Sequence, residues 1–280
     1  MYSGVYPELD SVMSQFVAGV RTALAENFVG AYLVGSLATG DFDLDSDVDF
    51  LIVTRAELSE PELAALRTTH MAIHALGNYP ARHLEGSYMG IDSLNRADGV
   101  GTEPLWYVDN GSTSLERSTH DNQWHVRWIL REWSIAVAGP EAKAFVRAVP
   151  VEVLRSEAAH AIRKLRDLVD AAAGQPLGWY NTRFGQSFAV LTCCRMLHTC
   201  KTGVVQSKLS GAKWAEQSLD PSWTGLIRAA WAERIGVRFG EKVRQPAEPS
   251  VVRETARFLA YAQKIEVDLV SGELSGESVR

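Results

Sequence analysis

The stretch YLVGSLATGDFDLDSDVDFLIV, residues 32–53, decides the fold of this chain. An apolar, β-rich run over residues 28–34 predicts a strand that ends at the Gly-Ser pair 35–36. Ten residues later the sequence SDVD, residues 46–49, leads into a second apolar run over residues 50–53. The stretch therefore predicts two strands that are joined by a polar loop.

Asp47 and Asp49 are expected on the same side of the second strand, because successive side chains alternate across a strand. Two neighbouring carboxylates repel each other unless a cation lies between them. Oxygen ligands of this type suit Mg²⁺ that keeps waters and bridges a substrate phosphate, and Gly35 and Ser36 suit the close approach of that phosphate. The alternative is an acidic surface hairpin, since the loop also carries three further aspartates, Asp41, Asp43 and Asp45.

This combination of strand, Gly-Ser pair, ten-residue loop and the motif DVDF at 47–50 resembles the nucleotidyltransferase pattern of the polymerase-β-like superfamily. The resemblance implies an α+β protein with an N-terminal mixed-sheet domain. It also implies that the Gly-Ser pair holds a nucleoside triphosphate and that the aspartates hold its metal ions. In that fold the next strand supplies a third carboxylate, which points to Glu85 in the strand-like run 82–89. Taken alone, Glu85 is equally well explained as a solvated residue on the outer face of that strand.

Composition places the chain among ordinary globular proteins. It has 280 residues, of which 46% are hydrophobic and 22% charged, and its net charge is −6. The negative charge argues against a protein that grips nucleic acid and is compatible with a small cationic substrate. We find neither a transmembrane run nor a secretory signal, and the clustered cysteines Cys193, Cys194 and Cys200 indicate buried, reduced thiols. We expect a cytoplasmic monomer that binds neither nucleic acid nor membranes.

The pattern of the sequence changes near residue 153. Downstream of it, helical apolar stripes separated by glycine or proline predict a bundle. We therefore predict a nucleotidyltransferase domain over residues 1–153 and a helical domain over residues 154–280 that closes the active-site cleft.

The polar stretch 92–122 is predicted as a long loop, and loops of that length are often functional. Trp106 lies in it, and it either stacks on a sugar or base or pins the loop to the core. The stretch also holds four carboxylates that can meet a cationic ligand, namely Asp92, Asp98, Glu103 and Asp109.

The second half of the chain gathers positive charge. No acidic residue lies between Asp170 and Glu216, whereas five basic residues do, namely Arg183, Arg195, Lys201, Lys208 and Lys213. Such a stretch suits a polyphosphate, which lysine and arginine neutralise. A basic pair of surface helices is the alternative.

Four segments resemble the streptomycin/spectinomycin adenylyltransferases of the aminoglycoside 3″ type. They are LTCCR at 191–195, KTGVVQSK at 201–208, WA at 214–215 and IAVAGP at 135–140. The resemblance implies ATP as co-substrate and a small cationic antibiotic as acceptor. The implied nucleotide-binding residues are Gly35, Ser36, Ser46, Arg195 and Lys208. The implied carboxylates are Asp47 and Asp49 for Mg²⁺ and Glu85 as general base, metal ligand or both.

One departure separates this chain from that family. Family members use acidic residues near the start of the helix at 186–200 to bind the cationic drug, but this chain has Gly185-Gln186-Ser187 there. We therefore assign the acceptor to Glu85, Trp106 and Asp109, and expect adenylyl transfer to a spectinomycin- or streptomycin-type hydroxyl. The alternatives are transfer to another antibiotic or to a protein side chain, and a nucleotide-binding module without turnover.

Overall fold

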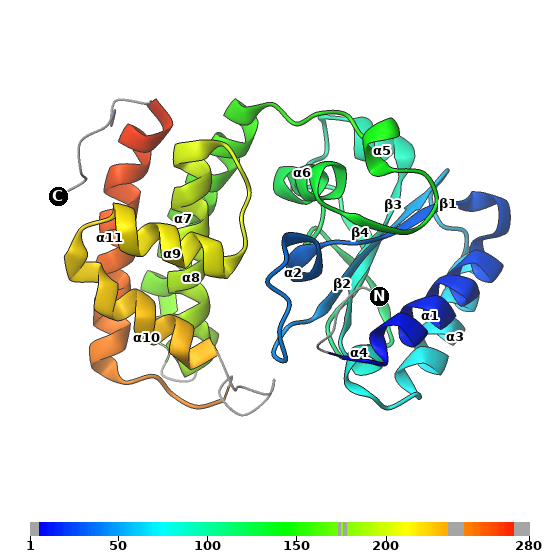
Figure 1. The fold of residues 1–280 in the computed structure, drawn as a ribbon, viewed down its shortest axis with the longest axis horizontal. Helices are drawn as coiled ribbons and strands as arrows, with labels where there is room; N and C mark the ends of the chain where they lie inside the picture. Colours follow the sequence, from blue (N-terminus) through cyan, green and yellow to red (C-terminus); the bar gives the residue numbers. More distant parts are fainter. Residues whose placement is uncertain (1–5, 173–174, 176–177, 235–243, 272–280) are drawn as a thin grey trace. The chain divides into compact units, whose positions relative to one another are not determined.

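The chain forms two compact units, Met1–Val149 and Pro150–Arg280, in a computed structural model (Figure 1). The structure describes residues 6–172, 175, 178–234 and 244–271. The division between the units falls just ahead of the helix α7, Val151–Ala172. None of the helices in these described ranges is long and apolar enough to span a membrane.

In the described part of the first unit, six strands form one mixed sheet in the order β5-β4-β3-β2-β1-β6. The central neighbours β2 and β3 are parallel, and the other neighbouring pairs are antiparallel. The strands are β1 (Phe28–Leu33), β2 (Val48–Thr54), β3 (Leu84–Gly90), β4 (Leu105–Val108), β5 (Leu115–Ser118) and β6 (Ile135–Ala138). The predicted α+β class with an N-terminal mixed sheet is confirmed.

One face of this sheet packs against α1 (Leu9–Leu24) and α3 (Glu60–His74), which lie side by side in Figure 1. The α3 helix begins at a capping box in which Ser59 and Glu62 satisfy each other's backbone amides. The apolar side of β2 meets α1 directly, since the rings of Phe16 and Phe50 lie 4.8 Å apart. The opposite face of the sheet carries the polar residues described below.

The segment predicted as one long polar loop, 92–122, is ordered differently. It continues α5 (Ile91–Asn95) and then forms the hairpin of β4 and β5. Each of these strands has only four residues, too few to stand out against the surrounding glycine, serine and aspartate. The remaining short helices of the unit are α2 (Gly35–Thr39), α4 (Tyr79–Arg82) and α6 (Trp124–Glu132).

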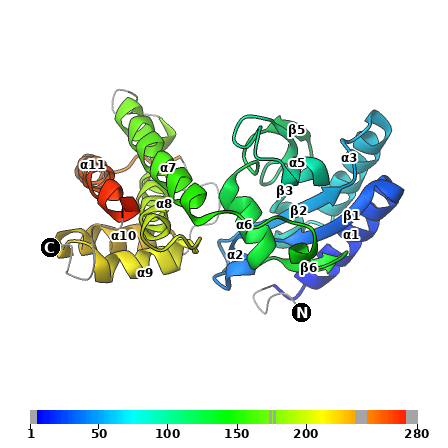
Figure 2. The ribbon, with the colours of Figure 1, turned by 90° about the horizontal axis from the view of Figure 1, so that it is seen from above.

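The second unit is helical, as predicted. Its helix α8 (Arg183–Thr202) packs against α7 and against α9 (Lys208–Ser218), α10 (Thr224–Arg234) and α11 (Pro249–Ser271), as Figures 1 and 2 show for α7, α8 and α11. Because α8 is surrounded, its buried residues occupy every side of the helix. They include Cys193, Cys194 and Cys200, which are free and, as predicted, buried.

Candidate active site

Asp49 and Glu85 lie side by side on neighbouring strands. They are register partners in the parallel pair β2–β3, so both carboxylates leave the sheet on the same face. That face is the one opposite α1 and α3, because Val48 and Phe50 belong to the core cluster beneath those helices. Glu85 is partly buried, with 15% of its side chain exposed. The structure thus brings together two of the carboxylates that the sequence singled out.

Gly35 closes one side of this pair. Its backbone has φ +59°, a left-handed conformation that side chains rarely adopt, and it begins the short helix α2. A Cβ on Gly35 would lie 1.8 Å from Oδ2 of Asp49, so the glycine backbone lies directly against that carboxylate. The amide of Val34 also donates to the Asp49 carbonyl at 3.0 Å. Only glycine fits here, and Ser36 follows it on the first turn of α2.

Asp47 is held by residues far away in the sequence. Asn110 Nδ2 donates to Asp47 Oδ1 at 2.5 Å, and Asn110 Oδ1 lies 2.8 Å from Nδ1 of His83. The His83 ring in turn stacks on Tyr79 at 4.0 Å. The preceding residue, Ser46, is buried and donates to Asp43 Oδ1 at 2.8 Å, which fixes the turn before the first aspartate. Sequence reasoning missed Asn110, for which no local signal exists.

Glu85 shares one hydroxyl with Asp109. Tyr107 Oη lies 2.6 Å from Glu85 Oε1 and 3.1 Å from Asp109 Oδ1, and Nε2 of His120 lies 3.4 Å from the same Glu85 oxygen. Burial raises the pKa of the Glu85 carboxyl, the Tyr107 hydrogen bond and His120 lower it, and Asp121 and Asp109 raise it further; the net direction is upward. An upward direction suits a group that must accept a proton.

Asp121 lies next to this group and is held by Ser87, whose hydroxyl donates to Oδ2 at 2.7 Å. Burial raises the pKa of the Asp121 carboxyl, against the opposing effects of His120, Ser87 and His125. Tyr107, His120 and Asp121 were not predicted as site residues. Tyr107 lies on the same face as Ser87, its register partner. The alternation of side chains along the strand 105–108 is the sequence signal that could have indicated this.

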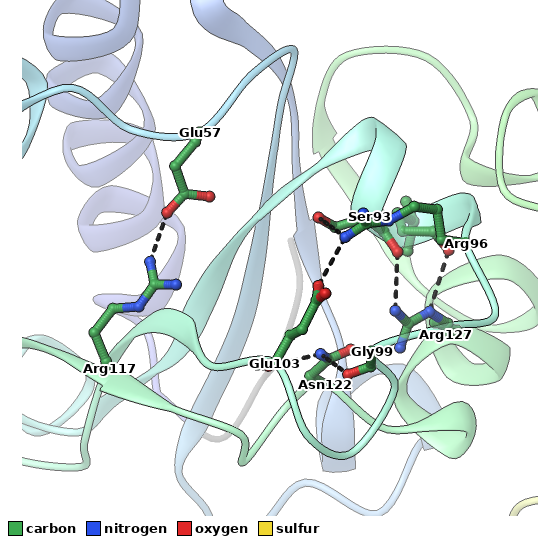
Figure 3. A network of polar contacts seen from close by, with 9 residues as sticks. Glu57, Ser93, Arg96, Gly99, Glu103, Arg117, Asn122 and Arg127 are labelled. Atoms are coloured by element: carbon green, nitrogen blue, oxygen red, sulfur yellow. Dashed lines mark hydrogen bonds and ion pairs between the residues drawn. The ribbon is translucent and has the colours of Figure 1, made fainter.

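A polar network fixes the backbone that carries His120 and Asp121 (Figure 3). Asn122 is buried and donates to the carbonyls of Gly99 and Glu103 at 2.9 and 2.7 Å. The buried guanidinium of Arg127 donates to the carbonyls of Ser93 and Leu94 at 3.0 and 3.1 Å. These bonds tie the start of α6 to α5 and to the loop between α5 and β4. His120 and Asp121, which lie beside Glu85, therefore belong to a segment that is held in place by these hydrogen bonds.

The structure places Trp106 on the face of the sheet opposite Glu85, away from its predicted position beside the acceptor. Trp106 pairs with Tyr88, so its side chain leaves the sheet on the face of α1 and α3 and packs against that core. Arg117 covers its ring at 5.1 Å and is itself paired with Glu57 (Figure 3). Successive side chains of a strand point to opposite faces, so Trp106 and Tyr107 cannot both lie on the face that carries Glu85. This geometry matches the core-packing alternative considered for Trp106.

The four carboxylates of the 92–122 segment differ in their surroundings. Asp109 shares the Tyr107 hydroxyl with Glu85, whereas Glu103 pairs with Arg96 at 2.7 Å (Figure 3). Asp92 lies in the first turn of α5, and Asp98 follows that helix. Asp109 is therefore the member of this set that the structure places beside Glu85.

Lys208 and Arg195 belong to the second unit. Lys208 opens α9 after the capping residue Ser207, and its Nζ lies 5.2 Å from the centre of the Phe188 ring. Arg195 lies in α8 where that helix meets α9, since a Cβ on Gly211 would lie 2.7 Å from the Arg195 Cα. Their predicted contacts with a nucleotide remain predictions.

Gln186 and Ser187, where the family resemblance implies acidic side chains, have structural roles in this chain. Gln186 is buried and its amide donates to the Tyr180 carbonyl, and the buried Ser187 donates to the Ala230 carbonyl at 2.7 Å. Both polar side chains are turned into the bundle. This part of α8 therefore presents neither a carboxylate nor a substitute for one.

Asp47 and Asp49 fit a magnesium ion that also takes ligands from a substrate. They supply oxygen donors, which Mg²⁺ prefers, and Gly35 keeps a side chain away from Asp49. Within the described ranges, no three His, Cys, Asp or Glu side chains are grouped so as to hold a metal ion. The role of Glu85 as a third metal ligand stays a prediction. A pair of carboxylates is enough for Mg²⁺ that keeps waters and binds phosphate oxygens.

Comparison with known proteins agrees with this geometry. Residues 17–87 match the nucleotidyltransferase domain model, and residues 147–262 match the model of the C-terminal domain of aminoglycoside adenylyltransferases. A spectinomycin 9-adenylyltransferase of Campylobacter jejuni is 25% identical, over 82% of this chain and 86% of its own length. A spectinomycin 9-adenylyltransferase of Staphylococcus aureus is 27% identical, over 75% of this chain and 79% of its own length.

A solved structure shares the fold. It is a spectinomycin adenyltransferase from Enterococcus faecialis with ATP and spectinomycin, with a TM-score of 0.67 and 15% identity over 91% of this chain and 98% of that one. The Asp49–Glu85 pair lies within the segment that matches the nucleotidyltransferase domain, and the helical unit contains most of the segment that matches the aminoglycoside adenylyltransferase C-terminal domain. The chain belongs to the aminoglycoside adenylyltransferase family and is an adenylyltransferase.

Proposed function

We propose that this enzyme transfers AMP from ATP to a hydroxyl of an aminocyclitol antibiotic of the spectinomycin type and depends on Mg²⁺. The observation that carries the proposal is the pairing of Asp49 with Glu85 on adjacent parallel strands beside Gly35. A module that only binds a nucleotide has no need of Glu85 in that position. The names of the relatives and of the solved structure support spectinomycin and ATP as the substrates.

Asp47 and Asp49 are the residues proposed to hold Mg²⁺. When bound, the ion neutralises phosphate oxygens and orients the α-phosphate. Gly35, Ser36 and Ser46 are proposed to contact the nucleotide from the first unit. Arg195 and Lys208 are proposed to contact its triphosphate from the second unit, where basic residues accumulate without carboxylates between Asp170 and Glu216.

Glu85 is the proposed general base. The acceptor hydroxyl loses its proton to the Glu85 carboxylate while its oxygen forms a bond to the α-phosphorus of ATP. The bond between that phosphorus and the bridging oxygen to the β-phosphate breaks, and pyrophosphate leaves with the electron pair. General-base help of this kind is typically worth about 10²–10⁴-fold in rate. Burial raises the pKa of Glu85, which brings it closer to the range in which a base works best at neutral pH.

Asp109 is the proposed partner of a cationic group on the acceptor. It lies beside Glu85 through the shared Tyr107 hydroxyl, so a bound ammonium would be near the base. Residues 171–215 supply no carboxylate, and Gln186 and Ser187 are turned inward. We therefore favour spectinomycin, the smaller ligand, over streptomycin, which requires a larger acidic surface.

Pyrophosphate release in the presence of ATP, Mg²⁺ and a panel of aminoglycosides and aminocyclitols tests the function. We expect release with spectinomycin and little or none with streptomycin. Glu85→Gln should bind ATP as the native enzyme does, measured by titration calorimetry, and should transfer AMP about 10²–10⁴-fold more slowly. Glu116→Gln is the matched control, because Glu116 is an exposed glutamate on β5.

Three results would contradict the proposal. Pyrophosphate release with none of the antibiotics would favour a different acceptor or a binding module. Full activity of Glu85→Gln would remove Glu85 from the role of base. Equal losses of ATP affinity and of rate in Glu85→Gln would make this residue a metal ligand instead.

A further inference from the structure

We propose that Tyr107 is a positioning residue for the general base: its hydroxyl fixes one oxygen of Glu85 so that the other oxygen meets the acceptor hydroxyl. This inference rests on the proposed role of Glu85. The contact is short, 2.6 Å from Tyr107 Oη to Glu85 Oε1, and links β4 to β3 across the sheet. Tyr107 was absent from the sequence prediction and lies outside the pattern that the family resemblance rests on.

A glutamate needs such a restraint to act as a base. The last torsion of its side chain has broad, roughly two-fold preferences, so the plane of the carboxylate is poorly defined by rotamer preference alone. Proton transfer requires the acceptor lone pair to point at the hydroxyl, within hydrogen-bond reach. A bond to one oxygen selects the rotation about that torsion and thereby aims the other oxygen.

Tyr107 is well placed to supply the restraint. It is 4% exposed, it pairs with Ser87 in the register of β3 and β4, and the His120 ring stacks on it with the centroids 5.2 Å apart. His120 Nε2 also approaches Glu85 at Oε1, at 3.4 Å. Both contacts end on the same oxygen. The structure thus treats the two oxygens of Glu85 unequally, and Oε2 is the one we assign to the acceptor proton.

Asp109 sharpens the assignment. A phenol carries one hydrogen and can donate it to one carboxylate at a time. The distance to Glu85 Oε1 is 0.5 Å shorter than the 3.1 Å to Asp109 Oδ1, so Glu85 is the receiver. Asp109 is then left to accept a hydrogen bond from an ammonium of the acceptor. The Tyr107 hydroxyl therefore distinguishes two neighbouring carboxylates: it donates to Glu85, the proposed base, and not to Asp109, the proposed partner of the acceptor cation.

The test compares Tyr107→Phe with Tyr88→Phe. Tyr88 is the neighbouring tyrosine of the sheet on the opposite face, where its hydroxyl lies 2.8 Å from Nε2 of His70, so both variants lose one hydrogen-bonded hydroxyl. We expect Tyr107→Phe to lower kcat for AMP transfer by roughly 10- to 100-fold, the range for a misplaced reacting group, and to leave KM for ATP and acceptor unchanged. Tyr88→Phe should keep the native kcat. Thermal unfolding of both variants separates this effect from loss of structure.

A double variant decides whether Tyr107 acts through Glu85. In a Glu85→Gln background the base is already gone, so adding Tyr107→Phe should slow transfer no further. A further tenfold loss in the double variant would overturn the proposal, as would native kcat in Tyr107→Phe. These failures are distinct from failure of the proposed function, because that is read from pyrophosphate release by the native enzyme with the antibiotic panel and from the single variant Glu85→Gln.

Discussion

Replacement of Gly35 by alanine tests most directly the corner of the site that is proposed to bind the nucleotide. The added methyl group meets Asp49 Oδ2 at 1.8 Å, and its nearest further neighbours are Cγ and Cβ of the same residue. Ordinary contact begins at 3.4 Å, so the carboxylate has to retreat by about 1.6 Å unless the backbone moves. A misplacement of about 1 Å at a reacting centre can reduce the rate by about 10².

Gly40→Ala is the matched control. Gly40 also has a left-handed backbone, with φ +79°, but a Cβ there meets nothing within 4 Å. Both variants should therefore lose about 1–2 kcal/mol of folding free energy from the unfavourable φ. Only Gly35→Ala has the additional collision with Asp49, which both destabilises the fold further and displaces the proposed metal ligand.

Two measurements separate these effects. Urea unfolding gives the free energy of unfolding of each variant, and the initial rate of pyrophosphate release at saturating ATP gives the activity. We expect Gly40→Ala to keep the native rate within about threefold and Gly35→Ala to fall by about 100-fold or more. If Gly35→Ala is as active as Gly40→Ala while both are folded, Asp49 does not need its observed position, and the site as described is wrong.

Lys208→Ala should weaken ATP binding by about 1.5–3 kcal/mol, the range for a hydrogen bond to a charged group, as measured by titration calorimetry. The control variant is Lys213→Ala, since Lys213 is an exposed lysine of the same helix. Equal affinities of the two variants for ATP would remove Lys208 from the nucleotide site. His70 is 3% exposed, and burial lowers its pKa to about 4, below the value of about 6.5 that the unfolded chain has. The unfolded state thus takes up the proton first, so the stability due to neutral His70 is complete above pH 6.5 and is lost as the pH falls to 4, by roughly 3 kcal/mol. Urea unfolding at pH 7 and pH 4.5 should show a smaller loss for His70→Leu than for the native chain, and an identical loss in both would contradict this account.

The nucleotidyltransferase motif and most of the helices could be predicted because their signals are local. The Gly-Ser pair at 35–36 and the aspartates Asp47 and Asp49 lie within fifteen residues of one another, and α3 is marked by its own capping box. The helices of the second unit show a period that repeats over several turns. In each case the residues that specify the element are close together in the chain, so the pattern is visible without knowledge of any partner.

The surroundings of Glu85 depended on the tertiary structure. Tyr107 is 22 residues from Glu85 in sequence, and Asn110 is 63 residues from Asp47. These pairs meet only because β4 joins β3 in one register, and a shift of one residue would exchange Trp106 and Tyr107 between the two faces of the sheet. A strand of four residues is too short for its sequence pattern to predict that register. The sequence alone therefore determined which chemistry the chain contains, and the pairing of short strands decided which side chains surround it.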